Sequence, residues 1–416
     1  MNDALDSAVS TRDIQAAETA HIVQTYRRVP VAFVRGRGVY LYDAEGREFV
    51  DFISGIGVAA LGHAHPGFAD ALADQWRTLV HTSNLYFHPL QGQLATALAR
   101  LSGLPRAFIC NSGTEANEAC LKFARRYWVA QGEPERTGIV ALDHAFGGRT
   151  CGSLSITWDA HYRDPFMPML IPSVTFVSPN DPDALLAAVS SQTMAIVAEP
   201  IQGEGGVRPL TPAFAEAIRQ ACARSGALYL ADEVQCGMGR TGQPFHFPAL
   251  GLTPDLVSVG KALGGGYPIG AALLSERVAS AIAYGDHGTT YGGNPAACRA
   301  ALFVIDQLEQ GLLAHVRAIG AVFERKLRAI AARHTDLVRE VRGKGLMWGL
   351  DLQRDASPVT QAALSRGLLV NRTSETVVRM LPPYIVSEAE VDRGLALLDA
   401  ALSDAAAAER KGTAHG

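Results

Sequence analysis

Two charged residues directly follow segments that the sequence predicts to be buried strands. Lys261 follows the apolar run "LVSVG" and precedes three consecutive glycines, and Asp232 directly follows the apolar run "ALYLA". Ligands of a parallel α/β sheet bind beyond the carboxyl ends of its strands, so we expect both side chains to face one crevice. The pair could be a structural salt bridge. Alternatively it could hold pyridoxal phosphate, with the lysine forming a Schiff base to the aldehyde and the aspartate pairing with the ring nitrogen.

A cofactor of this kind also needs a cradle for its phosphate, and "NSGTEAN" supplies a candidate. Ser112, Gly113 and Thr114 form a predicted loop that opens a helix. Backbone N–H groups and the helix dipole at such a place suit a dianion, and the two hydroxyls add donors. Taken alone, the same residues could simply be a helix N-cap. Together with Lys261 and Asp232 they favour a pyridoxal phosphate site.

Two glycine-rich motifs fit the patterns of nucleotide-binding loops poorly. "GMGRTG" matches G-x-G-x-x-G literally, but the following "QPFHFPALG" has two prolines and no helical periodicity. A dinucleotide fingerprint must open a helix, so this stretch is predicted to be a loop. Lys261 is not a P-loop lysine either, because Asp255 and Ala262 stand where that motif requires a glycine and a serine or threonine.

Short apolar strands alternate with helical segments through the middle of the chain. "GIVAL", "SVTFV", "MAIVAEP", "ALYLADEV", "DLVSVG" and "AALLS" are the predicted strands, with helices such as "AFAEAIRQACARSG" between them. This alternation predicts a mostly parallel sheet with helices on both faces. A hairpin over 35–52 precedes it, with "DAEG" as the turn. A long helical stretch, a smaller α+β unit and an amphipathic helix from about 387 follow it.

Composition limits the classes of protein that fit. The 416 residues carry a net charge of −4, which gives no electrostatic reason to expect nucleic acid or an anionic membrane as a partner. The six cysteines form no C-x-x-C pair, so no zinc or other metal site is expected. Unpaired thiols and an acidic N-terminus without an apolar core favour a cytoplasmic protein with no secretory signal.

Five motifs in order carry a family resemblance. "NSGTEANE", "EPIQGEGG", "LADEVQCGMGRTG", "GKALGGG" and "HGTTYGGNP" resemble the class III aminotransferases of pyridoxal phosphate fold type I, from about residue 25 to 400. The resemblance implies an α/β fold with a large, mostly parallel domain and a small α+β C-terminal domain. We expect an N-terminal segment over 1–65 that packs with the small domain, a large cofactor-binding domain over 66–305 and the small domain over 306–416.

The resemblance also implies roles for individual residues around the cofactor. Lys261 corresponds to the Schiff-base lysine that shuttles the proton, and Asp232 to the partner of the ring nitrogen. The other implied cofactor contacts are Gly113 and Thr114 to the phosphate, Phe146 and Val234 on the two faces of the ring, Gln235 to the phenolic oxygen, and Thr290. The family draws this last residue from the neighbouring subunit, so the resemblance implies a homodimer with shared active sites.

Substrate contacts follow from the same resemblance. Arg149 corresponds to the arginine that binds the distant α-carboxylate of an ω-amino acid, and Tyr26 to a substrate-contacting tyrosine. Arg379 corresponds to the arginine that binds 2-oxoglutarate or glutamate, and Glu204 is expected to cover it until the keto acid arrives. Arginine suits both places because its guanidinium binds a carboxylate through two hydrogen bonds. Ile56 falls where ornithine aminotransferases have a tyrosine, so an acylated donor, or one with no α-amine, is favoured over ornithine.

One departure from the family pattern concerns the pocket wall. The family usually has A-F-H-G-R where this chain has "AFGGR", so Gly147 replaces a histidine. Glu199 is expected to support the site without touching the ligand. Without the surrounding motifs, Arg149 or Arg379 taken singly could be interpreted as one half of a surface ion pair.

The predicted reaction is ping-pong transfer of the δ-amine of N2-acetylornithine to 2-oxoglutarate in arginine biosynthesis. The alternatives are another ω-amine donor (4-aminobutyrate, ornithine, succinyldiaminopimelate or an acylated lysine), a nucleotide-dependent dehydrogenase that uses "GMGRTG", and a non-catalytic pyridoxal-binding regulator.

Overall fold

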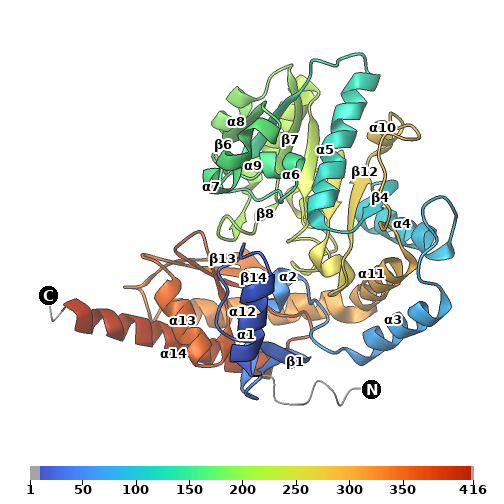
Figure 1. Cartoon of the computed structure of the whole chain (residues 1–416). Helices are drawn as coiled ribbons and strands as arrows, with labels where there is room; N and C mark the ends of the chain where they lie inside the picture. The colour runs from blue at the N-terminus through green and yellow to red at the C-terminus, as the bar shows by residue number, and fades with distance from the viewer. Residues whose placement is uncertain (1–9, 414–416) are drawn as a thin grey trace.

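A seven-stranded sheet forms the upper part of the molecule in Figure 1. The computed structural model describes residues 10–413. The strands lie in the order β4-β12-β11-β10-β7-β5-β6. Their bounds are Arg106–Cys110 (β4), Gly270–Leu274 (β12), Leu256–Val259 (β11), Leu228–Asp232 (β10), Thr193–Ala198 (β7), Gly138–Leu142 (β5) and Val174–Val177 (β6). All neighbours are parallel except β12, which runs antiparallel to β11 and β4. The predicted mostly parallel sheet is confirmed.

Apolar side chains cover both faces of this sheet, which is why its strands show continuous apolar runs. Ile139 and Leu230 pack with α5 (Gly113–Ala130) on one face. Their sequence neighbours Val140 and Tyr229 point to the other face and join the core with α8 (Pro182–Ala188) and α9 (Pro212–Ser225). The sheet therefore lies between helices, and its strand ends are the places left for a site.

The N-terminal segment forms its own small sheet. After α1 (Thr11–His21) come β1 (Phe33–Arg37), β2 (Tyr40–Asp43) and β3 (Glu48–Asp51). The predicted hairpin turn is present, with the Gly46 N–H donating to the Asp43 carbonyl at 3.0 Å. β15 (Leu368–Leu369) joins this sheet parallel to β3, so the N-terminal and C-terminal segments pack together. α3 (Pro66–Thr78) and α4 (Pro89–Ser102) follow, as the helical spacing predicts.

The C-terminal part contains a second sheet beneath the first (Figure 1). The long predicted helical stretch is present as α11 (Pro295–Gln307) and α12 (Leu313–Ala331), divided near Gly311, whose φ is 131°. The strands that follow are β13 (Val338–Lys344), β14 (Met347–Leu352), β16 (Asn371–Thr373) and β17 (Val377–Met380), in the order β13-β14-β17-β16. α13 (Ser357–Ser365) and α14 (Glu388–Thr413) complete this part.

The domain boundaries at residues 65 and 305 stay predictions. In the described part of the chain, no helix is both long enough and apolar enough to cross a membrane.

Candidate active site

Lys261 begins a short 3₁₀ turn, η3 (Lys261–Gly264), directly after strand β11 and Gly260. Its φ is 46°, in the left-handed region that side chains other than glycine rarely adopt. Gly265 and Gly266 continue the turn at φ 58° and 121°. Burial lowers the pKa of the Lys261 amine, against the opposing effect of the Glu204 carboxylate. The lowered pKa favours the neutral, nucleophilic form of the amine.

Asp232 lies at the end of β10, in register with Ser258 of the neighbouring strand β11. Its Oδ2 accepts a hydrogen bond from Asn117 Nδ2 at 2.7 Å, and its Oδ1 accepts one from the Val234 N–H at 3.0 Å. Burial raises the pKa of this carboxyl, while the hydrogen bonds oppose the shift. No ion pair in the described chain joins Asp232 to Lys261 or to any other cation, so the salt-bridge interpretation is wrong.

Asn117 was missed in the sequence, although "NSGTEAN" contains it. It lies four residues after Gly113, and residues at this spacing share one face of a helix. Besides Asp232, its Nδ2 also donates to the Gly147 carbonyl at 2.7 Å, and the residue is buried. Asn117 therefore ties the loop at Gly147 to the carboxylate at the end of β10.

The N-terminus of α5 meets the ends of β10 and β11. A Cβ added to Gly113 would lie 2.5 Å from Val234 Cγ1, and one added to Gly260 would lie 3.1 Å from Gly113 Cα. Ser112 is the N-cap, with its hydroxyl accepting the Glu115 N–H at 3.2 Å. The first N–H groups of a helix have no intrahelical acceptor and favour an anion. The N-cap and the phosphate cradle are therefore compatible interpretations of the same residues.

The Thr114 hydroxyl is directed to a neighbouring loop. It lies 2.6 Å from Ser153 Oγ and accepts the Arg149 N–H at 2.9 Å. A Cβ on Gly148 would overlap this hydroxyl at 2.1 Å, so the loop can pack there only because the residue is glycine. Thr114 thus joins the start of α5, where the phosphate cradle is predicted, to the loop that carries Arg149.

Gly147 is closely packed by the protein itself. Its N–H donates to Thr157 Oγ1 at 3.0 Å, and an added Cβ would lie 2.4 Å from Ile156 Cγ1 and 2.5 Å from the Ser153 carbonyl oxygen. A histidine could not occupy this backbone position without a shift of these neighbours. The departure from the family pattern is therefore matched by close packing around the residue.

Glu199 joins two loops from beneath the site. Its Oε1 accepts the Phe146 N–H at 3.2 Å and its Oε2 accepts the Gly203 N–H at 2.9 Å. Burial, followed by the negative charge of Asp232, raises the pKa of the Glu199 carboxyl to about 8. The residue contacts the backbone of both loops, and its supporting role toward a ligand stays a prediction.

Glu204 and Arg379 form an ion pair across the two parts of the molecule. Arg379 Nη1 lies 2.6 Å from Glu204 Oε1 and donates to Gln235 Oε1 at 3.1 Å, and its Nε donates to Asn371 Oδ1 at 3.2 Å. Burial would raise the pKa of Glu204, but Arg379 and Lys261 hold it below its usual range. Arg379 Nη2 is buried and has no partner among the described residues. This free donor is available to a carboxylate.

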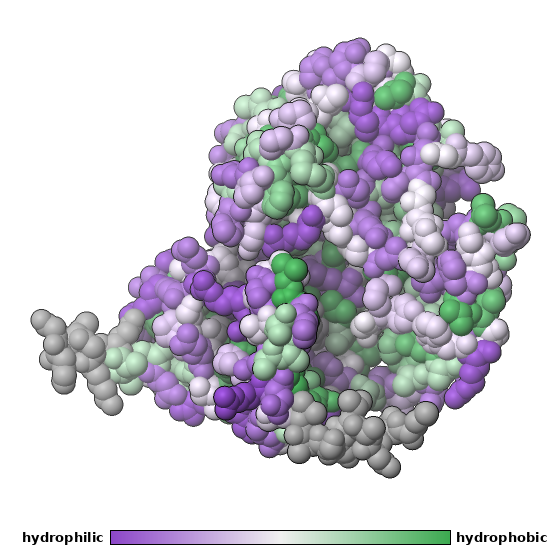
Figure 2. Space-filling view, viewed as in Figure 1, coloured by the Kyte–Doolittle hydropathy of each residue, from purple (hydrophilic) through white to green (hydrophobic). Residues whose placement is uncertain are grey.

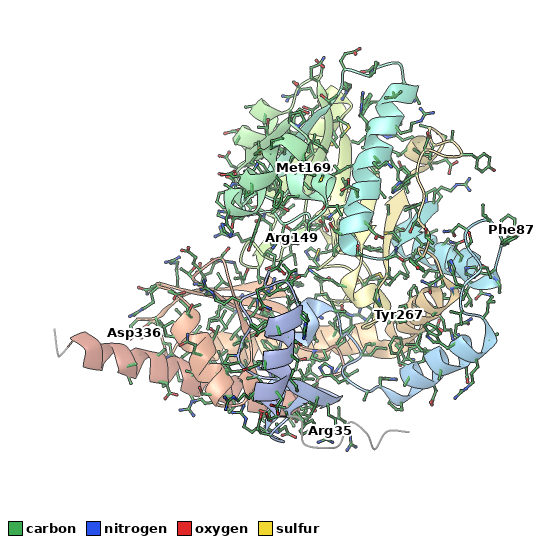
Figure 3. The ribbon with its side chains drawn as sticks, viewed as in Figure 1. Arg35, Phe87, Arg149, Met169, Tyr267 and Asp336 are labelled. Carbon is green, nitrogen blue, oxygen red and sulfur yellow. The ribbon has the colours of Figure 1, made fainter. Side chains whose placement is uncertain are left out.

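Arg149 and Ile56 are exposed at the surface of the molecule. Figure 2 shows that the face in view is hollowed between the upper and lower parts of the molecule, and Figure 3 places Arg149 at that junction. The Arg149 guanidinium lies 3.9 Å from the centre of the Tyr162 ring and 5.4 Å from that of Phe146. Ile56 is 44% exposed and has a φ of 64°.

Tyr26 and Thr290 are both exposed. No hydrogen bond or ring contact in the described chain joins either residue to the cluster around Lys261.

Comparisons with known proteins identify the family. The model of the class III aminotransferase family matches residues 22–402. This chain belongs to the class III aminotransferases. It is 44% identical to the acetylornithine aminotransferase of Methanocaldococcus jannaschii, over 92% of this chain and 96% of that protein. It is 42% identical to the acetylornithine aminotransferase of Aquifex aeolicus, over 91% and 98%.

Solved structures share the whole fold. The ornithine aminotransferase of Toxoplasma gondii superposes with a TM-score of 0.92 at 28% identity, covering 97% of this chain and 96% of that one. The N-acetylornithine aminotransferase of Stenotrophomonas maltophilia gives 0.81 at 33% identity, covering 92% and 99%. This aminotransferase therefore has the fold of pyridoxal phosphate fold type I, as predicted.

Class III aminotransferases use pyridoxal phosphate, and the residues here fit that cofactor. Asp232 is a buried carboxylate without a cationic partner in the described chain, which a protonated ring nitrogen would supply. The helix N-terminus at Gly113 suits the phosphate. Lys261, with its lowered pKa, is the amine at the same strand ends.

Proposed function

We propose that this aminotransferase moves the δ-amino group of N2-acetylornithine to 2-oxoglutarate by a ping-pong reaction, and that it serves arginine biosynthesis. The names of its most similar curated relatives support the donor. The proposal of 2-oxoglutarate as the acceptor rests on the buried Arg379. Its Nη1 binds Glu204, and its Nη2 has no partner among the described residues. A buried arginine with a displaceable carboxylate partner suits a second substrate that brings its own carboxylate.

Bound pyridoxal phosphate supplies an aldehyde that bonds to amines and a ring that withdraws electrons. The N–H groups of Gly113 and Thr114 would bind its phosphate, and Asp232, oriented by Asn117, would hold the proton on the ring nitrogen. Phe146 and Val234 would contact the ring, and Gln235 would donate to its phenolic oxygen. The Lys261 amine moves the proton at the substrate's reacting carbon.

Charge decides how each substrate is oriented. Arg149 binds the α-carboxylate of the ω-amine donor, which leaves the distal amine free to approach Lys261. Tyr26 contacts the donor, and the aliphatic Ile56 accepts an acylated α-amine better than a charged one. For 2-oxoglutarate, Glu204 leaves Arg379 and the α-carboxylate of the keto acid takes its place.

The donor is tested by comparing kcat/KM for N2-acetylornithine, ornithine and 4-aminobutyrate, each with 2-oxoglutarate. We expect the value for N2-acetylornithine to exceed that for ornithine by at least about 10-fold, since Ile56 gives no partner to a free α-amine. 4-Aminobutyrate has no α-amine, so its comparison rests on the names of the curated relatives, which favour N2-acetylornithine. A higher value for 4-aminobutyrate would replace the proposed donor and leave the class of reaction unchanged. A value of zero for every amine would indicate a binding protein.

We also propose a homodimer in which Thr290 reaches the partner's phosphate cradle. Thr290 lies in one of two adjoining loops that carry exposed large side chains: Leu85, Tyr86, Phe87, Tyr284 and Tyr291. Asn84 joins these loops, donating to the Thr289 and Gly292 carbonyls at 3.1 and 3.0 Å. Figure 3 shows Phe87 projecting from the edge of the molecule. Exposed apolar patches of this kind mark protein interfaces.

Replacing Phe87 with glutamate tests the dimer. A buried, unpaired charge would weaken association, so we expect monomers and reduced retention of cofactor at micromolar protein, measured by light scattering and by bound pyridoxal phosphate. Ser365→Glu adds the same charge on α13 and should leave the mass of the dimer in light scattering unchanged. A monomeric native protein with full activity would contradict the proposal.

Cytoplasmic location is proposed from the six cysteines, all of which are free. Cell fractionation that finds the protein elsewhere would contradict it.

A further inference from the structure

The loop that carries Glu204 is held by its backbone as well as by the side chain. It joins β8 (Ile201–Gln202) to β9 (Arg208–Pro209). The Glu204 carbonyl oxygen accepts hydrogen bonds from Thr373 Oγ1 at 2.5 Å and from Ser374 Oγ at 3.3 Å. Thr373 is buried, so water does not compete for this carbonyl from its side.

The next two carbonyls of the loop are also bound by side chains. Arg208 Nε donates to the Gly205 carbonyl at 2.7 Å, and Arg342 Nε donates to the Gly206 carbonyl at 2.8 Å. Arg342 is itself fixed by Asp351 at 3.0 Å. Three consecutive carbonyls are therefore occupied, so the backbone is immobilised while the Glu204 side chain stays one-third exposed.

One hairpin binds Glu204 at both of its ends. Thr373 is the last residue of β16 and Arg379 lies in β17. The three-residue turn between the strands, 374–376, has φ values of 48° and 53° at Ser374 and Glu375. This is the conformation of a tight hairpin turn. Thr373 pairs with Val377 across the hairpin, so the spacing between the Thr373 hydroxyl and the Arg379 guanidinium is fixed by strand register.

We propose that Thr373 is a positioning residue that places the Glu204 carboxylate on Arg379. The inference rests on the proposed roles of these two residues. With the backbone fixed, only the side chain of Glu204 moves when a dicarboxylate arrives. Without the Thr373 bond, Glu204 covers Arg379 less completely, so the α-carboxylate of 2-oxoglutarate or glutamate meets less competition. An ω-amine donor would instead bind unproductively through the uncovered arginine. Thr373 thus sets the balance between the two half-reactions.

Thr373→Val removes the hydroxyl and keeps the branched shape. In single-turnover assays of the holoenzyme, we expect kcat/KM for N2-acetylornithine to fall about 3-fold and that for 2-oxoglutarate to rise about 3-fold, the size of one uncharged hydrogen bond. Thr373→Ser should return both values to within about 2-fold of the native enzyme. Ser374→Ala, which loses the longer bond, should shift them less and in the same directions.

The matched control is Thr360→Val on α13, which also loses a hydroxyl-to-carbonyl hydrogen bond (to Ser357, 3.0 Å). It should leave unchanged the ratio of kcat/KM for N2-acetylornithine to kcat/KM for 2-oxoglutarate. In a Glu204→Gln background, Thr373→Val should have no further effect on the ratio, because the two changes act through one contact. Equal losses in both half-reactions, or no rescue by serine, would overturn the inference. Failure of the proposed donor would be seen in the native enzyme, and the ratio would then be measured with whichever ω-amine reacts fastest.

Discussion

Replacing Lys261 with alanine is expected to lower the rate of amino transfer by about 10⁴-fold, the upper range for loss of a positioned acid–base group. Lys261 lies at the convergence of the β11 end, the β10 end and the N-terminus of α5, and burial lowers the pKa of its amine. Because the neutral amine is both the nucleophile and the proton carrier, its removal should abolish both half-reactions. Stopped-flow measurement of each half-reaction checks this.

The control for Lys261 is Lys344→Ala, an exposed lysine at the end of β13, which should leave both half-reactions unchanged. Equilibrium dialysis of pyridoxal phosphate separates weak cofactor binding from lost chemistry, since the phosphate cradle and Asp232 are intact in Lys261→Ala. A variant that keeps cofactor and transfers amines at more than about a hundredth of the native rate would show that another group carries the proton.

The positions of Lys261 and Asp232 were predictable because strand periodicity decides them. Each residue ends an apolar run, and parallel strands bring their carboxyl ends to the same edge of a sheet. Gly113 and Thr114 were predictable for a similar local reason, since helix-start signals lie within a few residues of each other. These features belong to short segments, and short segments carry their own conformational preferences.

Contacts between segments that lie far apart in the chain could not be predicted from the residues alone. Glu204 lies in the loop between β8 and β9, and Arg379 lies in β17, 175 positions further along the chain. Only the family resemblance therefore paired them. The bonds from Thr373 and Arg342 to the Glu204 loop had no sequence signal, because they depend on how the second sheet packs against the first. The direction of the Thr114 hydroxyl likewise follows from the close approach of Gly148, which a single glycine in a sequence does not reveal.

Replacing Arg379 with methionine is expected to raise KM for 2-oxoglutarate about 100-fold while the half-reaction with N2-acetylornithine changes by less than about 5-fold. Arg379 is fully buried, and its Nη2 has no partner in the described chain, so a carboxylate that binds there loses both its donors and its counter-charge. Arg379 also lowers the pKa of Glu204, so its loss raises that pKa. Single-turnover assays of the two half-reactions measure these two changes separately.

The control for Arg379 is Arg372→Met, an arginine of the same hairpin that is exposed and pairs with Asp355 at 2.7 Å. It should leave both half-reactions unchanged, because an exposed ion pair contributes little. The raised pKa of Glu204 adds a second signature. Glu204 is ionised above its pKa, so in Arg379→Met its protonation on acidification should begin at a higher pH than in the native enzyme. Equal losses in both half-reactions would show that Arg379 supports the fold of the site and does not select the dicarboxylate.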